Sequence, residues 1–248
     1  MRMLPAIVSL FLCLSCSAQV KDYKLTLLET YPHDREAYTQ GLFFQLDTLY
    51  ETTGQYGEST LRKVDLKTGE VLQRVNFAHK YFAEGSCILD GKLYVLTWTN
   101  KVAFVYDPAT MKYEAAWSYP REGWGLTTDG ELLYASDGTN KIYVLSRDFK
   151  LKRTIFVSLE GRPLRFLNEL EWVDGKIWAN VYTTDMIVII DPKDGKVKSR
   201  IDCSGLLPEK ERRPETDVLN GIAVNSQGEI FLTGKYWPHI YKVKLSAK

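Results

Sequence analysis

Short runs of alternating apolar and polar residues recur along this chain, and turn-forming residues separate neighbouring runs. The pattern is clearest in residues 83–100, which read AEGSCILDGKLYVLTWTN. Two alternating runs there flank Asp90-Gly91, a dipeptide that strongly favours a two-residue hairpin turn. The stretch predicts two antiparallel strands. Because such strands run in opposite directions, Glu84 before the first and Trp98 after the second are expected at one edge of the sheet.

The same unit is repeated along the chain. Five copies, each with a run, a turn and a second run, begin at Tyr38, Ala83, Gly123, Asn168 and Leu219. Further alternating runs follow each pair, so each copy predicts a four-stranded meander. Because a repeat of roughly 20 to 50 residues indicates a repetitive architecture, we predict an all-β fold, a five-bladed β-propeller. A β-sandwich with similar turn spacing is the alternative.

The N-terminal strand is expected to complete this ring. The last copy ends at Lys248 after its third strand, so it lacks an outermost one. Residues 24–30, KLTLLET, alternate well and precede the first copy. We expect them to form the outer strand of the last blade and to tie the two chain ends together.

The first 18 residues predict that the protein is exported, and the remainder of the chain predicts a single domain. Residues 1–18 combine Arg2, an apolar core and small residues, as an export signal does. Cleavage after Ala18 predicts a periplasmic or secreted protein, whereas a lipoprotein signal would leave a lipidated Cys16 as the only membrane attachment. Residues 19–248 carry the unbroken repeat, which predicts one propeller domain.

The bulk composition narrows the classes of partner. Of the 248 residues, 45% are hydrophobic and 25% charged, and the net charge is +1. This balance does not suggest nucleic acid or an acidic membrane surface as a partner, and we expect a monomer. No spacing of cysteine and histidine suggests a metal site. Beyond the signal only Cys87 and Cys203 remain, and both are expected as buried single thiols.

Alignment of the copies brings polar and aromatic residues to one mouth of the predicted channel. The starts of the first strands give the candidates Gln40, Glu84, Trp124, Glu169 and Asn220. The ends of the second strands add Trp98, Tyr182 and Lys235, and Asn168 lies beside Glu169. Such a pocket, with aromatic walls and few convergent polar groups, is typical of a small-ligand site. Alternatively, these residues only satisfy backbone groups in a crowded funnel, and Lys235 forms a structural ion pair with Glu169.

Two loops carry further candidates. His33 and Asp34, before the first copy, are a possible catalytic pair, although a histidine that stitches the ring closure is the favoured interpretation. The longest connection, residues 203–219, carries a cluster of charges and two prolines. A long loop in a compact domain is usually functional or disordered, and we expect this one to be a flap near the site.

Several short motifs, in this order, resemble one enzyme family. They are AYTQGL, FAEGS, LTW, GWGL, LNELEW, IWANVY and LNGIA. Over Lys24 to Leu245 the chain resembles glutaminyl-peptide cyclotransferases of the plant and bacterial type. The resemblance implies a five-bladed propeller that converts the N-terminal glutamine of peptides or proteins to pyroglutamate with release of ammonia. It implies no cofactor for the chemistry and suggests a structural Ca²⁺ in the central channel.

The resemblance also implies roles for the candidates. Glu84 becomes the acid/base residue, taking a proton from the substrate α-amine and giving one to the leaving ammonia. The residues implied around the substrate are Gln40, Trp98, Trp124, Asn168 and Lys235. Gln40, Asn168 and Lys235 are candidates to hold the amide oxygen, and the aromatic rings exclude water. Tyr182 stands where many relatives have tryptophan, which leaves the substrate fit there open.

Two other functions remain possible from the residues. Some propeller hydrolases hold a Ca²⁺ that activates esters or lactones, and four of the candidates carry oxygen atoms that a hard cation accepts. These are Gln40, Glu84, Glu169 and Asn220. A non-catalytic binding propeller is the third interpretation, although a buried glutamate among tryptophans is unexpected in a scaffold.

Overall fold

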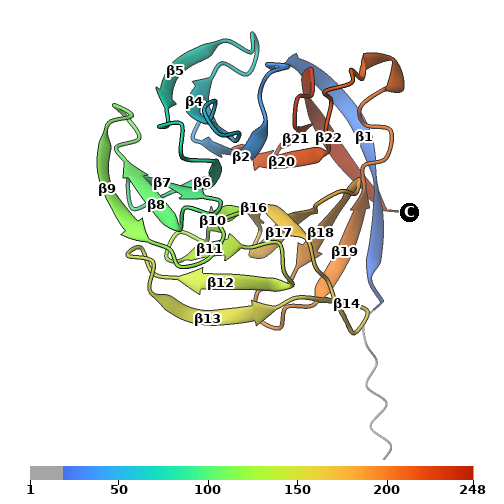
Figure 1. Cartoon of the computed structure of the whole chain (residues 1–248). Coiled ribbons are helices and arrows are strands. Elements are labelled where there is room, and N and C mark those ends of the chain that lie inside the picture. Colours follow the sequence, from blue (N-terminus) through green and yellow to red (C-terminus); the bar gives the residue numbers. More distant parts are fainter. Residues whose placement is uncertain (1–18, 248) are drawn as a thin grey trace, which may run out of the picture.

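Strands make up nearly all of the regular structure in this computed structural model, which describes residues 19–247 (Figure 1). The helical element of that part of the chain is a short 3-10 helix, η1 (Glu209–Glu211). No helix within residues 19–247 is long and apolar enough to cross a membrane. The expected export signal, residues 1–18, lies outside the described residues.

Three separate sheets each have four strands in chain order, as the repeat predicts. The first contains β2 (Thr39–Gln45), β3 (Thr48–Thr53), β4 (Thr60–Val64) and β5 (Val71–Asn76). The second contains β6 (Ala83–Leu89), β7 (Lys92–Thr97), β8 (Val102–Tyr106) and β9 (Tyr113–Ser118). The third contains β10 (Leu126–Thr128), β11 (Leu133–Ser136), β12 (Lys141–Leu145) and β13 (Leu151–Phe156).

A fourth, eight-stranded sheet consists of two such runs joined edge to edge. One run contains β16 (Leu167–Val173), β17 (Lys176–Val181), β18 (Met186–Ile190) and β19 (Val197–Asp202). The other contains β20 (Leu219–Val224), β21 (Ile230–Gly234), β22 (His239–Ala247) and the N-terminal β1 (Lys21–Pro32). The short strands β14 (Ser158–Leu159) and β15 (Arg162–Pro163) form a separate hairpin.

The N-terminal strand pairs with the last strand, as expected from the sequence. β1 runs antiparallel to β22, and the pairing extends from Tyr23 opposite Ala247 to Pro32 opposite His239. β1 also pairs in parallel with β19, which joins the last two runs into one sheet. The two ends of the described chain are therefore held in one sheet.

The first strands of the five runs face a common centre (Figure 1). β2 contacts β6 and β20, and β16 contacts β10 and β20, while β10 also contacts β6. Five clusters of buried apolar side chains fill the spaces between neighbouring runs. In the space between the second and third sheets, for example, Tyr119 and Leu133 are fully buried. Each run therefore needs both neighbours to cover its two faces.

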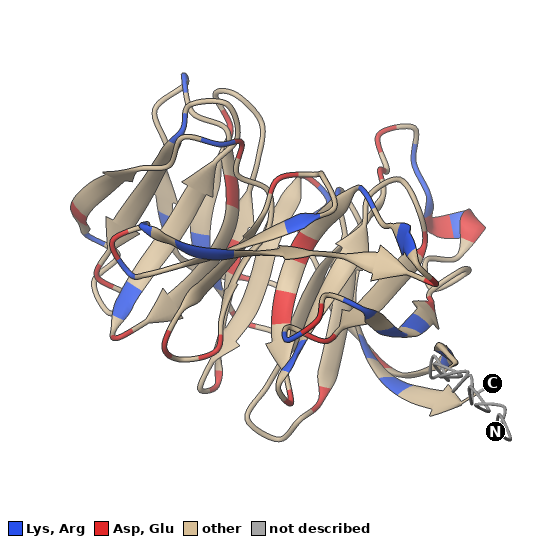
Figure 2. Ribbon diagram, turned by 90° about the horizontal axis from the view of Figure 1, so that it is seen from below, with Lys and Arg blue, Asp and Glu red and all other residues tan. Residues whose placement is uncertain are grey.

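Acidic and basic residues are interspersed along the ribbons in the view of Figure 2, as a net charge of +1 suggests. The two expected thiols, Cys87 and Cys203, are both free and buried.

The hairpin turn predicted at residues 90–91 has the expected backbone. Asp90 (φ 50°) and Gly91 (φ 68°) both have left-handed backbone angles. Positive φ at both central residues characterises the type I′ turn, whose twist matches that of the flanking strands. The turn joins β6 to β7 and so places Glu84 near Trp98.

The innermost strands approach one another so closely that one position admits only glycine. A Cβ atom on Gly125 would clash with the carbonyl oxygen of Asn168 and would lie 2.8 Å from the backbone nitrogen of Leu170. Because both are backbone atoms, neither can move without shifting β16. We expect Gly125→Ala to lower the free energy of unfolding by about 1–3 kcal/mol, a typical cost of overpacking. Denaturant unfolding measures this, and an unchanged midpoint would contradict the close approach.

Candidate active site

Four of the innermost strands share an irregularity near their first residues. In each, one or two residues are bypassed by the pairing with the second strand, which makes a β-bulge. A β-bulge re-aims side chains and is common beside active sites. The first bypassed residues are Gln40 in β2, Glu84 in β6, Asn168 in β16 and Asn220 in β20. Trp124 occupies the corresponding place just before β10.

The sequence alignment of these starts was wrong by one residue in the fourth copy. Leu167 and Leu170 are paired, so the two residues between them form the bulge. Asn168 is therefore the counterpart of Glu84, whereas Glu169 stands where β6 has Gly85. The sequence pattern favours aligning Glu169 with Glu84 because both are acidic. Alternation of apolar and polar residues does not show where a strand bulges.

Glu169 is buried and bonds to backbone groups of neighbouring innermost strands. Its carboxylate accepts hydrogen bonds from the backbone N–H groups of Leu42 in β2 (3.4 Å) and Ile222 in β20 (3.0 Å). Burial and the nearby Glu171 raise its pKa well above the usual range. Within the described chain no ion pair joins it to Lys235. Glu169 thus ties three innermost strands together.

Glu84 is buried among groups that shift the pKa of its carboxyl group in opposite directions. Only 4% of the residue is exposed, and this burial raises the pKa of its carboxyl group well above the usual value. The charge of Lys235 and a hydrogen bond from the Gln40 side chain lower that pKa, and the charge of Glu122 raises it. Burial has the largest effect, so Glu84 loses its proton only at a pH well above that of an ordinary glutamate.

Asn220 orients Gln40 for this hydrogen bond. The Asn220 side-chain N–H₂ donates to the backbone oxygen of Thr39 (2.9 Å) and to the side-chain oxygen of Gln40 (3.3 Å). Because its oxygen is engaged, Gln40 presents its own N–H₂ group to Glu84. The side chains of Asn220, Gln40 and Glu84 therefore form a chain of hydrogen bonds from β20 through β2 to β6.

Lys235 follows β21 and lies between two phenol rings. Its ammonium nitrogen is 4.5 Å from the centre of the Tyr38 ring and 4.9 Å from that of Tyr182. A cation over such rings is stabilised by their electron-rich faces. Burial lowers the pKa of Lys235, which the charges of Glu84 and Asp217 oppose. Burial therefore disfavours the charged forms of both Lys235 and Glu84.

Aromatic rings enclose this group of side chains. The indole of Trp124 meets the Tyr182 ring edge-on, with centroids 5.5 Å apart. The indole of Trp98 meets Phe82 in the same way at 5.6 Å. The expected wall residues Trp98, Trp124 and Tyr182 thus come from three different runs, and each packs against another aromatic ring.

Sequence reasoning missed three residues of this enclosure. Each lies two residues before a candidate at the start of an innermost strand: Tyr38 before Gln40, Phe82 before Glu84, and Glu122 before Trp124. The repeat contains this signal, because an aromatic or acidic residue recurs at that offset. Alignment of the strand starts and ends alone does not include these positions.

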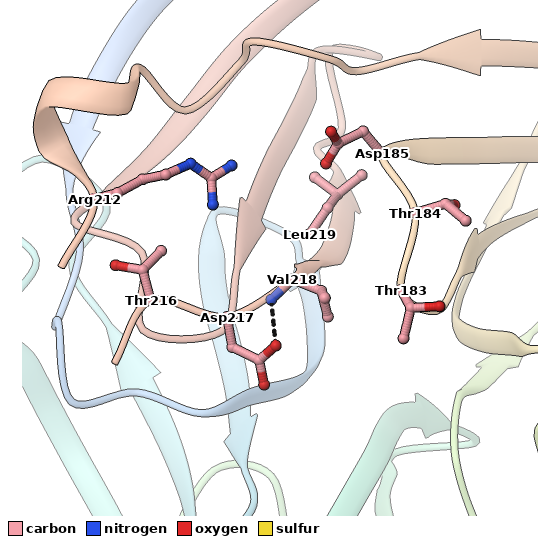
Figure 3. A pocket seen from close by; sticks show the side chains of 8 residues that line it. All are labelled: Thr183, Thr184, Asp185, Arg212, Thr216, Asp217, Val218 and Leu219. Carbon is pink, nitrogen blue, oxygen red and sulfur yellow. Dashed lines mark hydrogen bonds between the residues drawn. The ribbon is translucent and has the colours of Figure 1, made fainter. Parts of the chain in front are cut away.

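A cavity of about 300 Å³ is lined by residues that include Asp217 and Val218, whose backbone groups are hydrogen-bonded to the backbone of Lys235. Figure 3 shows it between the turn at Thr183 to Asp185 and the segment that leads into β20. Asp217 from this segment accepts hydrogen bonds from the Tyr38 hydroxyl and from the N–H of Val218. The connection of residues 203–219 therefore borders the site. Its action as a flap stays a prediction.

Two of the four oxygen-bearing candidates for a Ca²⁺ site are engaged in hydrogen bonds within the protein. Both carboxylate oxygens of Glu169 accept backbone N–H groups, and Gln40 is bonded to Asn220. Within residues 19–247, no group of three or more histidine, cysteine, aspartate or glutamate side chains is placed to hold a metal ion. Glu169 and Gln40 are therefore already engaged, and the expected structural Ca²⁺ in the central channel stays a prediction.

The other sequence candidates, His33 and Asp34, belong to a separate cluster. His33 bonds to Glu51 (2.9 Å) and to the backbone oxygen of Trp237 (2.8 Å). Asp34 bonds to Arg62 (2.7 Å). The favoured interpretation of His33 as a ring-closing residue agrees with these contacts.

A buried acid with a raised pKa, an adjacent amine and nearby aromatic rings are features typical of an active site that carries out acid/base chemistry. A family model described as glutamine cyclotransferase matches residues 5–245. The chain is 40% identical over 230 residues to a glutaminyl-peptide cyclotransferase of Arabidopsis thaliana, covering 90% of this chain and 71% of that protein. The crystal structure of Myxococcus xanthus glutaminyl cyclase superposes with a TM-score of 0.86 at 34% identity, covering 93% of this chain and all of that one.

The chain therefore belongs to the glutamine cyclotransferase family. The family and the enzyme class expected from the sequence motifs are confirmed.

Proposed function

We propose that this chain converts the N-terminal glutamine of peptides or proteins to pyroglutamate and releases ammonia, with Glu84 transferring the protons. The observation that carries the proposal is the setting of Glu84, buried beside Gln40 and Lys235 and enclosed by aromatic rings. Family membership supplies the reaction class. The substrate supplies its own nucleophile, so no serine or cysteine is needed.

The reaction forms one bond and breaks another. The free α-amine attacks the side-chain amide carbon of the same glutamine, the new C–N bond closes a five-membered ring, and the old C–N bond breaks to release NH₃. Glu84 accepts a proton from the attacking amine and returns it to the leaving nitrogen. A free α-amine has a pKa of about 7.7–8.0. Raising the pKa of Glu84 towards this value makes the transfer easier in both directions.

The remaining polar groups hold the substrate amide. Lys235 and the N–H₂ groups of Gln40 and Asn168 are proposed to stabilise the amide oxygen as negative charge develops on it. The side-chain oxygen of Asn168 is buried and has no hydrogen-bond partner among the described residues. It is free to accept an N–H of the substrate. The rings of Trp98, Trp124 and Tyr182 hold the glutamine in its curled conformation and exclude water.

We further propose that the five four-stranded runs are the blades of a five-bladed propeller closed by β1. The contacts among β2, β6, β10, β16 and β20 support this arrangement. We propose that residues 1–18 direct export, and that the mature protein is a monomer in the periplasm, secreted, or anchored through a lipidated Cys16. The chemistry as proposed needs no cofactor, because every proton step uses Glu84.

A coupled assay of ammonia release tests the function. We expect the purified chain to release ammonia from a dipeptide that begins with glutamine, and not from the same dipeptide beginning with asparagine, whose shorter side chain would close a strained four-membered ring. A chelator such as EDTA should leave the rate unchanged. Absence of ammonia from the glutamine dipeptide would refute the proposed activity, and loss of activity with EDTA would refute a metal-independent mechanism.

A further inference from the structure

One carboxylate oxygen joins two walls of the proposed active site. Oε2 of Glu122 accepts a hydrogen bond from the indole N–H of Trp98 (2.9 Å) and another from that of Trp124 (3.3 Å). Trp98 directly follows β7 of the second sheet, and Trp124 precedes β10 of the third. The acid therefore fixes two indoles from different sheets relative to each other.

The backbone at Glu122 is itself tied to the end of β7. The N–H of the next residue, Gly123, lies 3.1 Å from the backbone oxygen of Thr97 and 3.2 Å from that of Trp98, donating to both. A Cβ atom on Gly123 would lie 2.6 Å from the Cβ of Leu96, so the position requires glycine for this close approach. Glu122 is consequently held beside the indole that it binds.

The carboxylate of Glu122 has no competing cation. In the described chain no ion pair is formed by Glu122, and its neighbour Arg121 lies over the Tyr143 ring at 4.3 Å. An indole packed only by its faces can rotate about its side-chain bonds, whereas a hydrogen bond at its N–H fixes one orientation. Glu122 is exposed, and its Oε2 atom accepts both indole N–H groups.

We propose that Glu122 is a positioning residue, which holds the indoles of Trp98 and Trp124 in the orientation that clamps the glutamine side chain. The inference rests on the proposed function. It goes beyond the site expected from the sequence, which contains no residue that holds the aromatic rings.

The charge of Glu122 has a second effect on the site. The charged and polar groups that act on Glu84 are Lys235 and Gln40, which lower its pKa, and Glu122, which raises it. Removing the negative charge should therefore lower the pKa of Glu84. The acid limb of the pH profile should then move to lower pH.

Two substitutions separate the hydrogen bonds from the charge. Glu122→Ala removes both, and we expect KM for a glutamine dipeptide to rise about tenfold, the size expected for lost hydrogen bonds to a charged acceptor. Its kcat should change much less. Glu122→Gln keeps an acceptor oxygen for the indoles, so KM should stay within about threefold of wild type. Both variants should shift the acid limb to lower pH.

Glu131→Ala is the matched control, because Glu131 is an exposed acid of the third sheet at the turn before β11. It should leave both KM and the pH profile unchanged. Wild-type KM in Glu122→Ala would overturn the proposal. A KM in Glu122→Gln as high as in Glu122→Ala would also overturn it, because the retained acceptor would then be irrelevant. Turnover by the wild-type chain in the same assay separates these outcomes from failure of the proposed function. If Glu122→Ala does not fold, KM of Glu122→Asp, whose shorter acid cannot reach both indoles, replaces it.

Discussion

Glu84→Gln is expected to reduce the rate of glutamine cyclisation by about 10² to 10⁴, the usual contribution of one general acid/base group. Glutamine has nearly the same shape as glutamate but can neither accept the amine proton nor return it to the leaving nitrogen. Because burial already favours the neutral form of Glu84, the uncharged amide should fit the site with little structural change. The measurement is kcat for a glutamine dipeptide, together with a thermal melt to show that the variant is folded.

Glu171→Gln is a suitable control for this variant. Glu171 is also a buried acid of an innermost strand, and burial raises its pKa to about 8. Its carboxylate accepts a hydrogen bond from the backbone N–H of Val224, the last residue of β20 (3.1 Å). We expect nearly wild-type kcat. Wild-type cyclisation by a folded Glu84→Gln variant would remove the assignment of Glu84.

The raised pKa values of the buried acids also set the direction of the pH dependence of stability. A carboxyl group whose pKa is higher in the folded than in the unfolded state stabilises the fold below its unfolded pKa, and that stabilisation is lost as pH rises through the folded pKa. Glu84, Glu169 and Glu171 all have this sign. For Glu171 the window runs from 4.5 to about 8. Glu171→Gln should therefore weaken the fall in stability over that window.

The sequence pattern predicts the strands well but not their irregularities. Alternation and turn dipeptides identify the five runs because each strand packs both faces against neighbouring runs, and Asp90-Gly91 has only one favoured turn type. A bulge breaks the alternation by one or two residues without changing composition. That is why Asn168, and not Glu169, turned out to be the counterpart of Glu84.

The contacts that orient the site residues also could not be predicted from the sequence. Gln40 and Trp98 were found because they stand at strand ends, whereas the bonds that hold them come from other runs. Asn220 reaches Gln40 across 180 positions of sequence, and Glu122 reaches Trp98 from the next sheet. Such contacts depend on how sheets are placed relative to one another, which periodicity does not describe. The parallel pairing of β1 with β19 was missed for the same reason.

Glu51→Gln is expected to cause a large loss of stability. Glu51 lies in β3 with 1% of its surface exposed, and its carboxylate accepts bonds from His33 (2.9 Å) and Thr39 (2.8 Å) and lies 3.7 Å from Arg62. Leaving a buried charge without its partner typically costs about 3–5 kcal/mol. For a chain of this size that corresponds to a fall in Tm of roughly 6–20 °C.

The cluster matters because it joins the two ends of the chain. His33 follows β1 directly, and its second ring nitrogen bonds to the backbone oxygen of Trp237 between β21 and β22. Loss of Glu51 should therefore loosen the closure at β1 before the other sheets. Hydrogen exchange of the β1 and β22 amides, compared with those of β6 and β7, measures this order.

The pH dependence distinguishes a buried ion pair from simple packing. Interaction with the charged and polar neighbours of Glu51 outweighs its burial and lowers its pKa to about 2, so its contribution is lost as pH falls from 4.5 through about 2. The pKa of His33 is raised, mainly by Glu51 against the opposing effect of burial, so its contribution is lost as pH rises from 6.5 through the folded pKa.

The difference in Tm between wild type and Glu51→Gln should be largest between these limits and shrink on both sides. Glu229→Gln, which breaks an ion pair with Lys242 at the surface, should show little change at any pH. A difference for Glu51→Gln that is constant with pH would mean that shape, and not charge, holds the ends of the chain together.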